Sequence, residues 1–459
     1  MSAEPGRTME LKFNGKIKTA KLPGQKRPAE QAVLRMPTLM GVESACKQEL
    51  TALGFEAAQI TVSDASVALT VPWEEMPAAV AALNLNLRTA ERVLLHLIDF
   101  NVQNFADFIA AVDAVPFEKY LDPGYFIDIV GYSRDSKLSS VPALQRLLKK
   151  AVIKRLQNYS PAAETCNVNG IWEENRNLGS DRLQFSLVRD KFSLDLDTSG
   201  EALYKRSYRP LNHPAPIRET LAAAILYFAH FLPNCENYRE VLFDPVCGSG
   251  TFLIEAALLL THTAPGLKRA FRAEKMRLVG ENVFLQARKE AESRSYLYAP
   301  PVAQQPLYNL LFGADIDKRA LKSAQENAQR AGVSSYINWM CADLTAYASG
   351  GIMPFPQVQE AERVLVLANP PYGERLGDEV QVARLHRAFK QLLFQKKEAS
   401  VAAATAQERR QHNYYELKKK YRFSLITHCA DLEKQLSCKA NKRRKLYNGM
   451  LPCTLYQYF

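Results

Sequence analysis

The chain has 459 residues, enough for two or three domains, and its hydrophobic content of 47% supports ordinary buried cores. Lysine and arginine outnumber aspartate and glutamate by 59 to 48, a formal charge of +11 that suits an anionic polymer as partner, although many basic proteins bind none. The lack of an apolar run of about 18 residues excludes a membrane-spanning helix, and the eight cysteines form no C-x-x-C pair that would signal a zinc site or a redox pair.

Residues 1–32 are basic and polar, and they lack the apolar core of a signal peptide. We expect a flexible tail here, and the alternative is an arm that binds RNA. Scattered cysteines without pairing motifs fit reduced thiols, so we expect a cytoplasmic protein.

A small α+β module is predicted over residues 33–100. Helix and strand patterns alternate along this stretch. The predicted elements are a helix at 43–53 ended by Gly54, strands at 60–62 and 66–71, a helix near 77–83 and a strand at 92–98. This order is typical of a small α+β layer.

A second unit is predicted over residues 101–199. Strand patterns occur at 125–132, 184–188 and 192–197. Between the first two lies a predicted helix with Pro142 in its first turn, a favoured place for proline. The apolar stripe of this helix consists of Leu144, Leu147, Leu148 and Ala151.

The same helix carries positive side chains on another face. Lys137 precedes it, and Arg146, Lys150 and Lys154 recur at every fourth residue. A row of cations at intervals of about 6 Å suits a phosphate backbone. A solvated helix face has the same pattern and is the alternative.

A basic and aromatic segment follows at the predicted domain junction. Lys205, Arg206 and Arg209 alternate with Tyr204 and Tyr208. Aromatic rings stack on bases while arginine and lysine bind phosphate, so this segment is a candidate for RNA contact. The alternative is an ordinary linker that packs its tyrosines.

A glycine-bearing turn links a short strand at 241–243 to a helix that runs from Thr251 to Leu260. Glycines there let the backbone approach a ligand closely, and the start of the helix exposes free amides. The candidate cofactor residues of this turn are Asp244, Pro245, Cys247, Gly248, Gly250 and Thr251.

Acidic residues follow the next two predicted strands. The strand at 310–314 delivers Asp315, Ile316 and Asp317, and a carboxylate at that place binds ribose hydroxyls in open α/β sheets. Asp317 is equally well placed to cap the helix at 319–331. Asp343 ends the strand at 336–342 and suits an adenine amino group, with a helix cap or loop acid as the alternative.

Asp315 lies much farther from the glycine turn than the roughly 20 residues that are usual. The stretch 263–307 is therefore predicted to be an insertion after the first helix, and its many lysines and arginines fit either an RNA surface or a solvated helix.

The apolar run 364–368 ends in Asn369, Pro370, Pro371 and Tyr372. A buried strand that ends in this way places an amide and a proline carbonyl at the carboxyl edge of a sheet. Neither group titrates, and together they offer two hydrogen-bond acceptors beside a flat ring. This set suits a planar amine that attacks an electrophilic carbon, so these four residues are the candidate catalytic residues.

The last part of the chain is less regular. Residues 391–421 have the composition of an exposed helix or loop, and strands are predicted at 423–427 and 453–459. The densest basic run, at 439–445, is interpreted as a turn in the last hairpin of the sheet, with the final strand antiparallel.

Taken together, these motifs resemble the class I S-adenosylmethionine-dependent RNA methyltransferases that carry an N-terminal THUMP domain. Within them the chain is most similar to the bacterial 23S ribosomal RNA guanine-N2 methyltransferases and their shorter homologues. The matching segments are 87–93, 203–209, 215–223, 244–257, 369–377 and 441–449, and the family usually has glycine at the position of Ser207.

The resemblance implies an α/β fold: a ferredoxin-like module at 33–100, a THUMP RNA-binding domain at 101–199 and a Rossmann-like methyltransferase domain at 200–459 with a mostly parallel seven-stranded sheet. It favours the RNA role of the helical cations over a solvated face. The implied cofactor is S-adenosylmethionine, the implied partner is ribosomal RNA, and neither a metal nor a membrane is expected.

The implied reaction is methyl transfer to the exocyclic N2 amine of a guanine. In that interpretation the Asn369 side-chain oxygen and the Pro370 carbonyl accept the two N–H bonds, and Tyr372 stacks on the base. Three alternatives remain: a transfer RNA substrate, a DNA adenine-N6 methylase that uses the same Asn-Pro-Pro-Tyr pocket, and an inactive RNA-binding factor for ribosome assembly.

Overall fold

The computed structural model describes residues 30–121, 124–159, 174–210, 217–231, 240–298, 309–371, 378–396 and 415–459. The chain forms two compact units that do not follow the chain order. Unit 1 contains the described residues up to Pro37 together with 47–203 and 270–289, and unit 2 contains 38–46, 204–269 and 290–459. Part of the predicted insertion, 270–289, therefore packs within unit 1.

Unit 1 is built on one seven-stranded sheet that runs through both predicted N-terminal modules. Its order is β2-β3-β1-β4-β7-β6-β5, and only the β5–β6 pair is parallel. The strands are β1 (Gln31–Pro37), β2 (Ile60–Ser63), β3 (Ser66–Pro72), β4 (Leu94–Asn101), β5 (Tyr125–Arg134), β6 (Asn175–Val188) and β7 (Lys191–Asp197). The junction between the two modules is the antiparallel β4–β7 pair, which joins them in one sheet with a register shift between His96 and Ile98.

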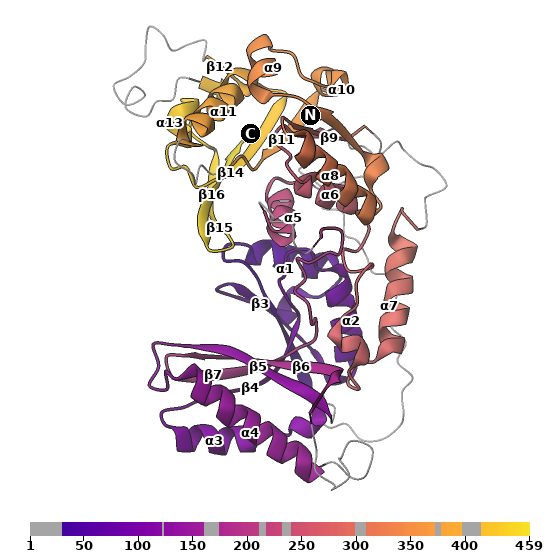
Figure 1. Cartoon of the computed structure of the whole chain (residues 1–459), viewed down its shortest axis with the longest axis vertical. Helices are drawn as coiled ribbons and strands as arrows, with labels where there is room; N and C mark the ends of the chain where they lie inside the picture. Colours follow the sequence, from indigo (N-terminus) through magenta and orange to yellow (C-terminus); the bar gives the residue numbers. More distant parts are fainter. Residues whose placement is uncertain are drawn as a thin grey trace, which may run out of the picture. The chain divides into compact units, whose positions relative to one another are not determined.

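The helices of this part of the chain follow the predicted pattern, with one addition. They are α1 (Glu43–Ala52), which contributes to both units, α2 (Met76–Asn86), α3 (Phe105–Asp113) and α4 (Val141–Tyr159) (Figure 1). The sequence analysis did not predict α3. Asn104 caps its start by accepting a hydrogen bond from the Asp107 amide, and Phe108 packs edge-on against Phe192 of the sheet.

Unit 2 contains a second seven-stranded sheet with the order β10-β9-β8-β11-β14-β16-β15. The strands are β8 (Glu240–Asp244), β9 (Leu311–Asp315), β10 (Ile337–Cys341), β11 (Arg363–Ala368), β14 (Tyr421–Thr427), β15 (Lys442–Asn448) and β16 (Leu451–Tyr458). The first five strands in this order are parallel, and β16 is antiparallel to both of its neighbours. The prediction of a mostly parallel α/β sheet with an antiparallel final strand is confirmed.

Helices cover both faces of this sheet because its strands are apolar on both sides. On β11, Leu365 and Leu367 face one buried cluster while Val364, Val366 and Ala368 face the other. The first cluster includes α5 (Glu219–Phe228), α6 (Thr251–Leu260) and α8 (Lys318–Ala331). The second includes α9 (Leu344–Gly350), α10 (Pro356–Glu360), α11 (Asp378–Leu393) and α13 (Leu432–Leu436); these helices are labelled in Figure 1.

The basic run near the C-terminus is not a turn. Lys442 to Lys445 lie in strand β15, which pairs with β16 in register from Lys442–Gln457 to Asn448–Leu451. The hairpin turn is at Gly449 and Met450, where Gly449 has φ 66°. The prediction was wrong because β15 is the edge strand of the sheet, and the exposed side chains of an edge strand are often charged.

The stretch 391–421 is described only at its two ends, where the short strands β12 (Phe394–Lys396) and β13 (Tyr415–Leu417) pair with each other. Of the tail predicted over 1–32, residues 1–29 lie outside the described residues, as do residues 397–414, and the last two residues of the tail belong to β1. Within the described ranges, no helix combines the length and the apolar character needed to cross a membrane.

Candidate active site

The glycine turn after β8 has the tight geometry that the sequence predicts. The Gly250 amide donates to the Cys247 carbonyl at 2.8 Å, and Gly248 and Gly250 have φ of 53° and 79°. A Cβ atom on Gly250 would lie 2.6 Å from Trp339 Cη2, so both the backbone conformation and the packing exclude a side chain. The start of α6 therefore follows a turn in which two of the last three residues, Gly248 and Gly250, carry no side chain.

Asp315 lies at the end of β9 and holds this turn in place. Its carboxylate accepts one hydrogen bond from the Gly248 amide at 2.8 Å and another from the Asp317 amide at 2.9 Å. One carboxylate thus joins the loops that follow two neighbouring strands, β8 and β9. This contact brings the predicted glycine turn and the predicted ribose acid together.

The two other predicted acids cap helices. Asp317 accepts from the Arg319 amide at 2.8 Å at the start of α8, and Asp343 accepts from the Thr345 amide at 2.8 Å at the start of α9. The backbone amide of Arg319 lowers the pKa of Asp317. Capping was the alternative for both residues, and it accounts for their side chains in the protein alone.

Two ionisable groups of this turn are buried. Burial raises the pKa of Asp244 well above its usual range, and the nearby charge of Asp315 adds to this effect. Burial and the same two carboxylates raise the pKa of the Cys247 thiol. Asp244 accepts a hydrogen bond from the Val246 amide at 3.1 Å, which fixes the chain as it leaves β8.

Tyr347 belongs to this site, although the sequence analysis did not single it out. Its hydroxyl is buried and has no hydrogen-bond partner among the described residues. Burial raises its pKa, and so do the carboxylates of Asp244, Asp343 and Asp315, which lie close enough to act on it. The only sequence signal is its position four residues after the cap Asp343, on the same face of α9.

Asn369 and Pro370 follow the end of β11, at the same edge of the sheet. The register aligns Cys341 with Asp315, Gly313 with Asp244, and Phe243 with Val366, so the carboxyl ends of four parallel strands lie side by side. Pro370 is buried and Pro371 is exposed, whereas Tyr372 lies outside the described residues. The strand order departs in opposite directions from β8 and β11, and ligands of open α/β sheets bind at such a crossover.

These features fit a sulfonium nucleoside such as S-adenosylmethionine. The turn could accept close approach of a ligand, Asp315 lies at a strand end where ribose can bind, and the orphaned Tyr347 hydroxyl could supply a hydrogen bond. Ile316 is 65% exposed although it is apolar, and it could pack against an adenine ring. Within the described part of the chain, no cluster of three or more His, Cys, Asp or Glu side chains has the arrangement of a metal site.

The predicted RNA-binding cations divide into two groups. Lys137, Arg146, Lys150 and Lys154 are exposed in unit 1. The Lys137 ammonium donates to Gln103, and the Lys154 ammonium lies 3.5 Å from the Asp113 carboxylate. These bonds at an exposed surface leave the side chains accessible to a phosphate backbone.

The structure contradicts the prediction that Arg206 and Arg209 contact RNA. The Arg206 side chain is 2% exposed and pairs with the fully buried Glu255 of α6, and Arg209 pairs with the buried Glu219 and donates to Thr251. Their guanidinium groups satisfy carboxylates inside unit 2 and are not available to phosphate, because breaking a buried pair is costly. The linker alternative therefore describes this segment better, while Lys205 remains half-buried.

Family models match two parts of the chain. The model described as "RMKL-like, methyltransferase domain" matches residues 206–425, and the one described as "RlmL ferredoxin-like domain" matches residues 34–94. These ranges cover the glycine turn, the acids and Asn369–Pro370 of unit 2, and strands β1 to β3 of unit 1.

Curated relatives extend the match over nearly the whole chain. "Putative RNA methyltransferase YpsC" of Bacillus subtilis is 30% identical over 421 residues, which is 92% of this chain and 94% of the relative. "Ribosomal RNA large subunit methyltransferase K/L" of Pseudomonas aeruginosa is 30% identical over 420 residues, or 90% of this chain and 51% of the relative. The chain thus spans about half the length of the K/L enzymes.

Solved structures agree in fold. A "possible methylase" from Clostridium difficile 630 has a TM-score of 0.74 at 31% identity and matches 94% of this chain and 98% of its own. SMU.472, a "putative methyltransferase complexed with SAH", has a TM-score of 0.74 at 28% identity with the same coverage. SAH is the demethylated product of S-adenosylmethionine, so S-adenosylmethionine is the cofactor of this kind of methyltransferase, and the chain belongs to the RlmL-like family of S-adenosylmethionine-dependent methyltransferases.

Proposed function

We propose that this protein transfers a methyl group from S-adenosylmethionine to the exocyclic N2 amine of a guanine in RNA, with ribosomal RNA of the large subunit as the substrate. The observation that carries the proposal is the position of Asn369 and Pro370 at the end of β11, beside the loops that hold Asp315 and the glycine turn.

The chemistry explains why two uncharged acceptors are suitable. The lone pair of a guanine N2 amine is conjugated with the ring, so the amine is a poor nucleophile. The Asn369 side-chain oxygen and the Pro370 carbonyl would accept hydrogen bonds from its two N–H groups and favour a pyramidal nitrogen as positive charge develops. The N–CH3 bond forms as the sulfonium S–CH3 bond breaks, and the methylated nitrogen then loses one proton to water. S-adenosylmethionine supplies an already activated methyl group, so alignment of donor and amine contributes much of the remaining acceleration.

On the cofactor side, Asp315 would bind the ribose hydroxyls, and the amides near Gly248 and Gly250 would approach the methionine part. Ile316 would pack against adenine, and Asp343 would accept from its amino group. Tyr372, the remaining residue of the motif, would stack on the target base, which must leave its helix to reach this edge.

Two observations support RNA as the substrate. Unit 1 exposes the cations Arg146, Lys150 and Lys154 along α4 at a spacing that suits phosphates. In addition, the relatives that match over about nine-tenths of this chain are named as RNA or ribosomal RNA methyltransferases.

Asn369→Ala tests the proposal directly. With labelled S-adenosylmethionine and ribosomal RNA, we expect a loss of about 10²- to 10³-fold in kcat, as for removal of one donor or acceptor from a preorganised site. Cofactor affinity, measured by calorimetry with SAH, should stay unchanged. Asn101→Ala, which removes an exposed asparagine of β4 in unit 1, is the matched control. Near-normal turnover by Asn369→Ala would remove the acceptor role.

A DNA adenine-N6 methylase is the second candidate, because a solved relative from Listeria monocytogenes is named a "predicted N6-adenine-specific DNA methylase". The same variants on duplex DNA separate the candidates. Methyl transfer to duplex DNA that exceeds transfer to ribosomal RNA would contradict the RNA proposal.

A further inference from the structure

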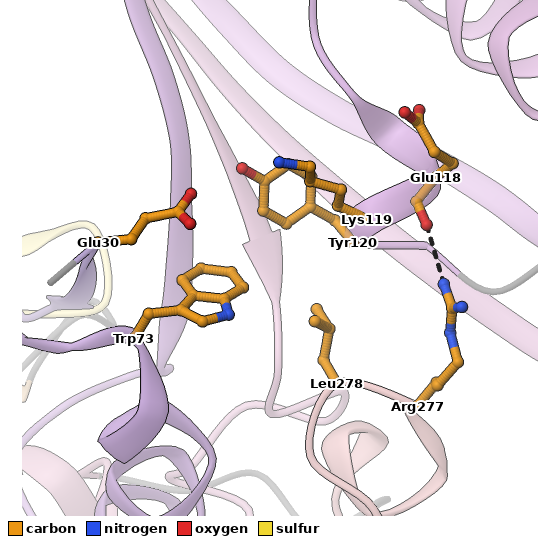
Figure 2. Close-up of a pocket in the computed structure, with 7 residues that line it drawn as sticks. All are labelled: Glu30, Trp73, Glu118, Lys119, Tyr120, Arg277 and Leu278. Atoms are coloured by element: carbon orange, nitrogen blue, oxygen red, sulfur yellow. Dashed lines mark hydrogen bonds between the residues drawn. The ribbon is translucent and has the colours of Figure 1, made fainter. Parts of the chain in front are cut away.

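Unit 1 contains a pocket of about 520 Å³ that is separate from the cofactor edge of unit 2. Its size lies within the range of roughly 300–1,000 Å³ that is common for ligand pockets. The lining residues are Glu30, Trp73, Glu118, Lys119, Tyr120, Arg277 and Leu278. Figure 2 shows that the Trp73 and Tyr120 rings, the Glu30 carboxylate and Leu278 border the same space.

The two aromatic rings form a corner. Their centroids are 6.1 Å apart and their planes meet at 74°. A flat ligand that stacks on one ring therefore meets the other at its edge, and the apolar Leu278 adds to the lining. Such a corner favours a planar heteroaromatic ring over an aliphatic chain.

Glu30 supplies a specific acceptor. Its carbonyl accepts from the Trp73 amide at 2.7 Å, which fixes it beside the ring, and no described cation pairs with its carboxylate. Burial and the carboxylates of Glu30 and Glu118 raise the pKa of Tyr120, in keeping with a Glu30 carboxylate that faces the ring. A carboxylate with two free oxygens matches two adjacent N–H donors on one edge of a base.

One residue of the pocket, Glu118, contacts α4, the helix that carries the exposed cations. Glu118 forms two hydrogen bonds of 2.8 Å with Arg155 near the end of α4, and its carbonyl accepts from Arg277 at 2.9 Å (Figure 2). Lys154, the neighbour of Arg155, is the last cation of the exposed row. Lys119 and Arg277 are exposed among the lining residues, where a phosphate flanking the base would meet them.

We propose that this pocket binds an unpaired guanine of the RNA substrate. The base stacks in the corner of Trp73 and Tyr120, and the Glu30 carboxylate accepts from its N1–H and N2–H groups. Adenine presents an acceptor at N1, which would face the carboxylate, so the pocket prefers guanine. The inference rests on RNA as the substrate and assigns a second, non-catalytic contact with it.

The test uses the full chain carrying Asn369→Ala. This substitution keeps guanine binding by the proposed catalytic acceptor from contributing to the measured affinity. Short single-stranded uridine-rich RNAs contain either one guanine or one adenine at the same position. We expect the guanine strand to bind about tenfold more tightly, and Glu30→Gln should abolish this preference. Trp73→Ala should weaken binding of the guanine strand by about tenfold.

Two further variants keep the test decisive. Tyr132→Ala removes a 56% exposed ring of β5 outside the pocket and should change affinity less than twofold. Trp73 is one of three tryptophans, and Trp73→Phe keeps an aromatic platform, so the variant should fold and bind while quenching of tryptophan fluorescence on RNA addition becomes smaller. Equal affinities of the parent and the Trp73→Ala protein, or quenching of undiminished size in Trp73→Phe, would overturn the proposal.

Failure of this inference differs from failure of the proposed function. If the protein with Asn369 intact methylates RNA while the Trp73 variants bind normally, only the pocket assignment is wrong. If the pocket reads guanine but no methyl transfer to RNA occurs, the proposed reaction is wrong and the pocket stands.

Discussion

At the scale of single residues, the site depends on a carboxylate that serves two loops. Asp315 accepts from the amides of Gly248 and Asp317, so it orders the backbone on both sides of the cofactor edge. Asp317 has a local role instead, as the cap of α8. Two acids separated by one residue thus have different duties, which a sequence pattern alone does not distinguish.

Asp315→Asn should weaken SAH binding by about tenfold or more, because hydrogen bonds to a charged group contribute about 1.5–3 kcal/mol. Asp317→Asn removes the same charge two residues away, and asparagine caps helices as well as aspartate does. We expect the control to stay within about twofold of the parent. Equal SAH affinities of the two variants by calorimetry would refute the ribose role of Asp315.

We expect Tyr347→Phe to leave the protein at least as stable as the parent and to weaken its binding of the cofactor. The hydroxyl is buried without a described partner, so its removal should leave the free energy of unfolding unchanged or raise it by about 1 kcal/mol. If the hydroxyl contacts the cofactor, SAH affinity should fall by roughly tenfold. Urea unfolding and calorimetry on the same samples measure both effects, and a destabilised variant with normal affinity would contradict this role.

At the scale of secondary-structure elements, the segment 204–209 stabilises α6 through buried contacts inside unit 2. Arg206 and Tyr208 both contact Glu255 of α6, while Arg209 contacts Thr251 at the helix start behind the glycine turn. Ser207, where the resembling family usually has glycine, has φ 67°, a left-handed conformation that favours glycine. The alternation of basic and aromatic residues here reflects internal packing, although the same composition is typical of RNA-binding surfaces.

The exposed cations of helix α4 are predicted to contribute to RNA affinity. Replacing Arg146, Lys150 and Lys154 by glutamine should weaken RNA binding and lower the slope of log Kd against log salt by about 2–3, because up to three phosphate contacts are lost. SAH affinity should not change. A triple glutamine variant of the exposed Lys47, Lys434 and Lys439 has the same net charge and should keep the original slope. Identical slopes for both variants would mean that the α4 cations form a solvated face and do not bind RNA.

At the scale of the whole molecule, the sequence predicts the parts of the fold that have strong local signals. Every parallel strand of unit 2 was predicted within a few residues, because each contains a short apolar run, and four of the five (β8, β9, β10 and β11) end in, or within two residues of, an acid or a proline. The helices α3, α9, α10, α11 and α13 and the strands β1 and β15 were missed. Their residues are selected by contacts with distant segments, such as Phe108 with Phe192, and a local pattern does not contain that information.

The residues of the site divide in the same way into those that a local sequence pattern predicts and those that it does not. Asp315, the glycine turn and Asn369 are visible in the sequence because strand ends mark them. Tyr347 is not visible, since nothing local distinguishes it from any helical tyrosine that packs on a core. The buried pairing of Arg206 and Arg209 depends on Glu255 and Glu219, which were not recognised as partners.

The central claim is that the acceptors after β11 present a guanine N2 amine to the methyl donor held after β8 and β9. The most direct measurement is mass spectrometry of nucleosides from large-subunit ribosomal RNA incubated with the protein and isotopically labelled S-adenosylmethionine. The account predicts the label in N2-methylguanosine and its loss with Asn369→Ala. Label in N6-methyladenosine, or in N2-methylguanosine at an undiminished level with Asn369→Ala, would contradict it.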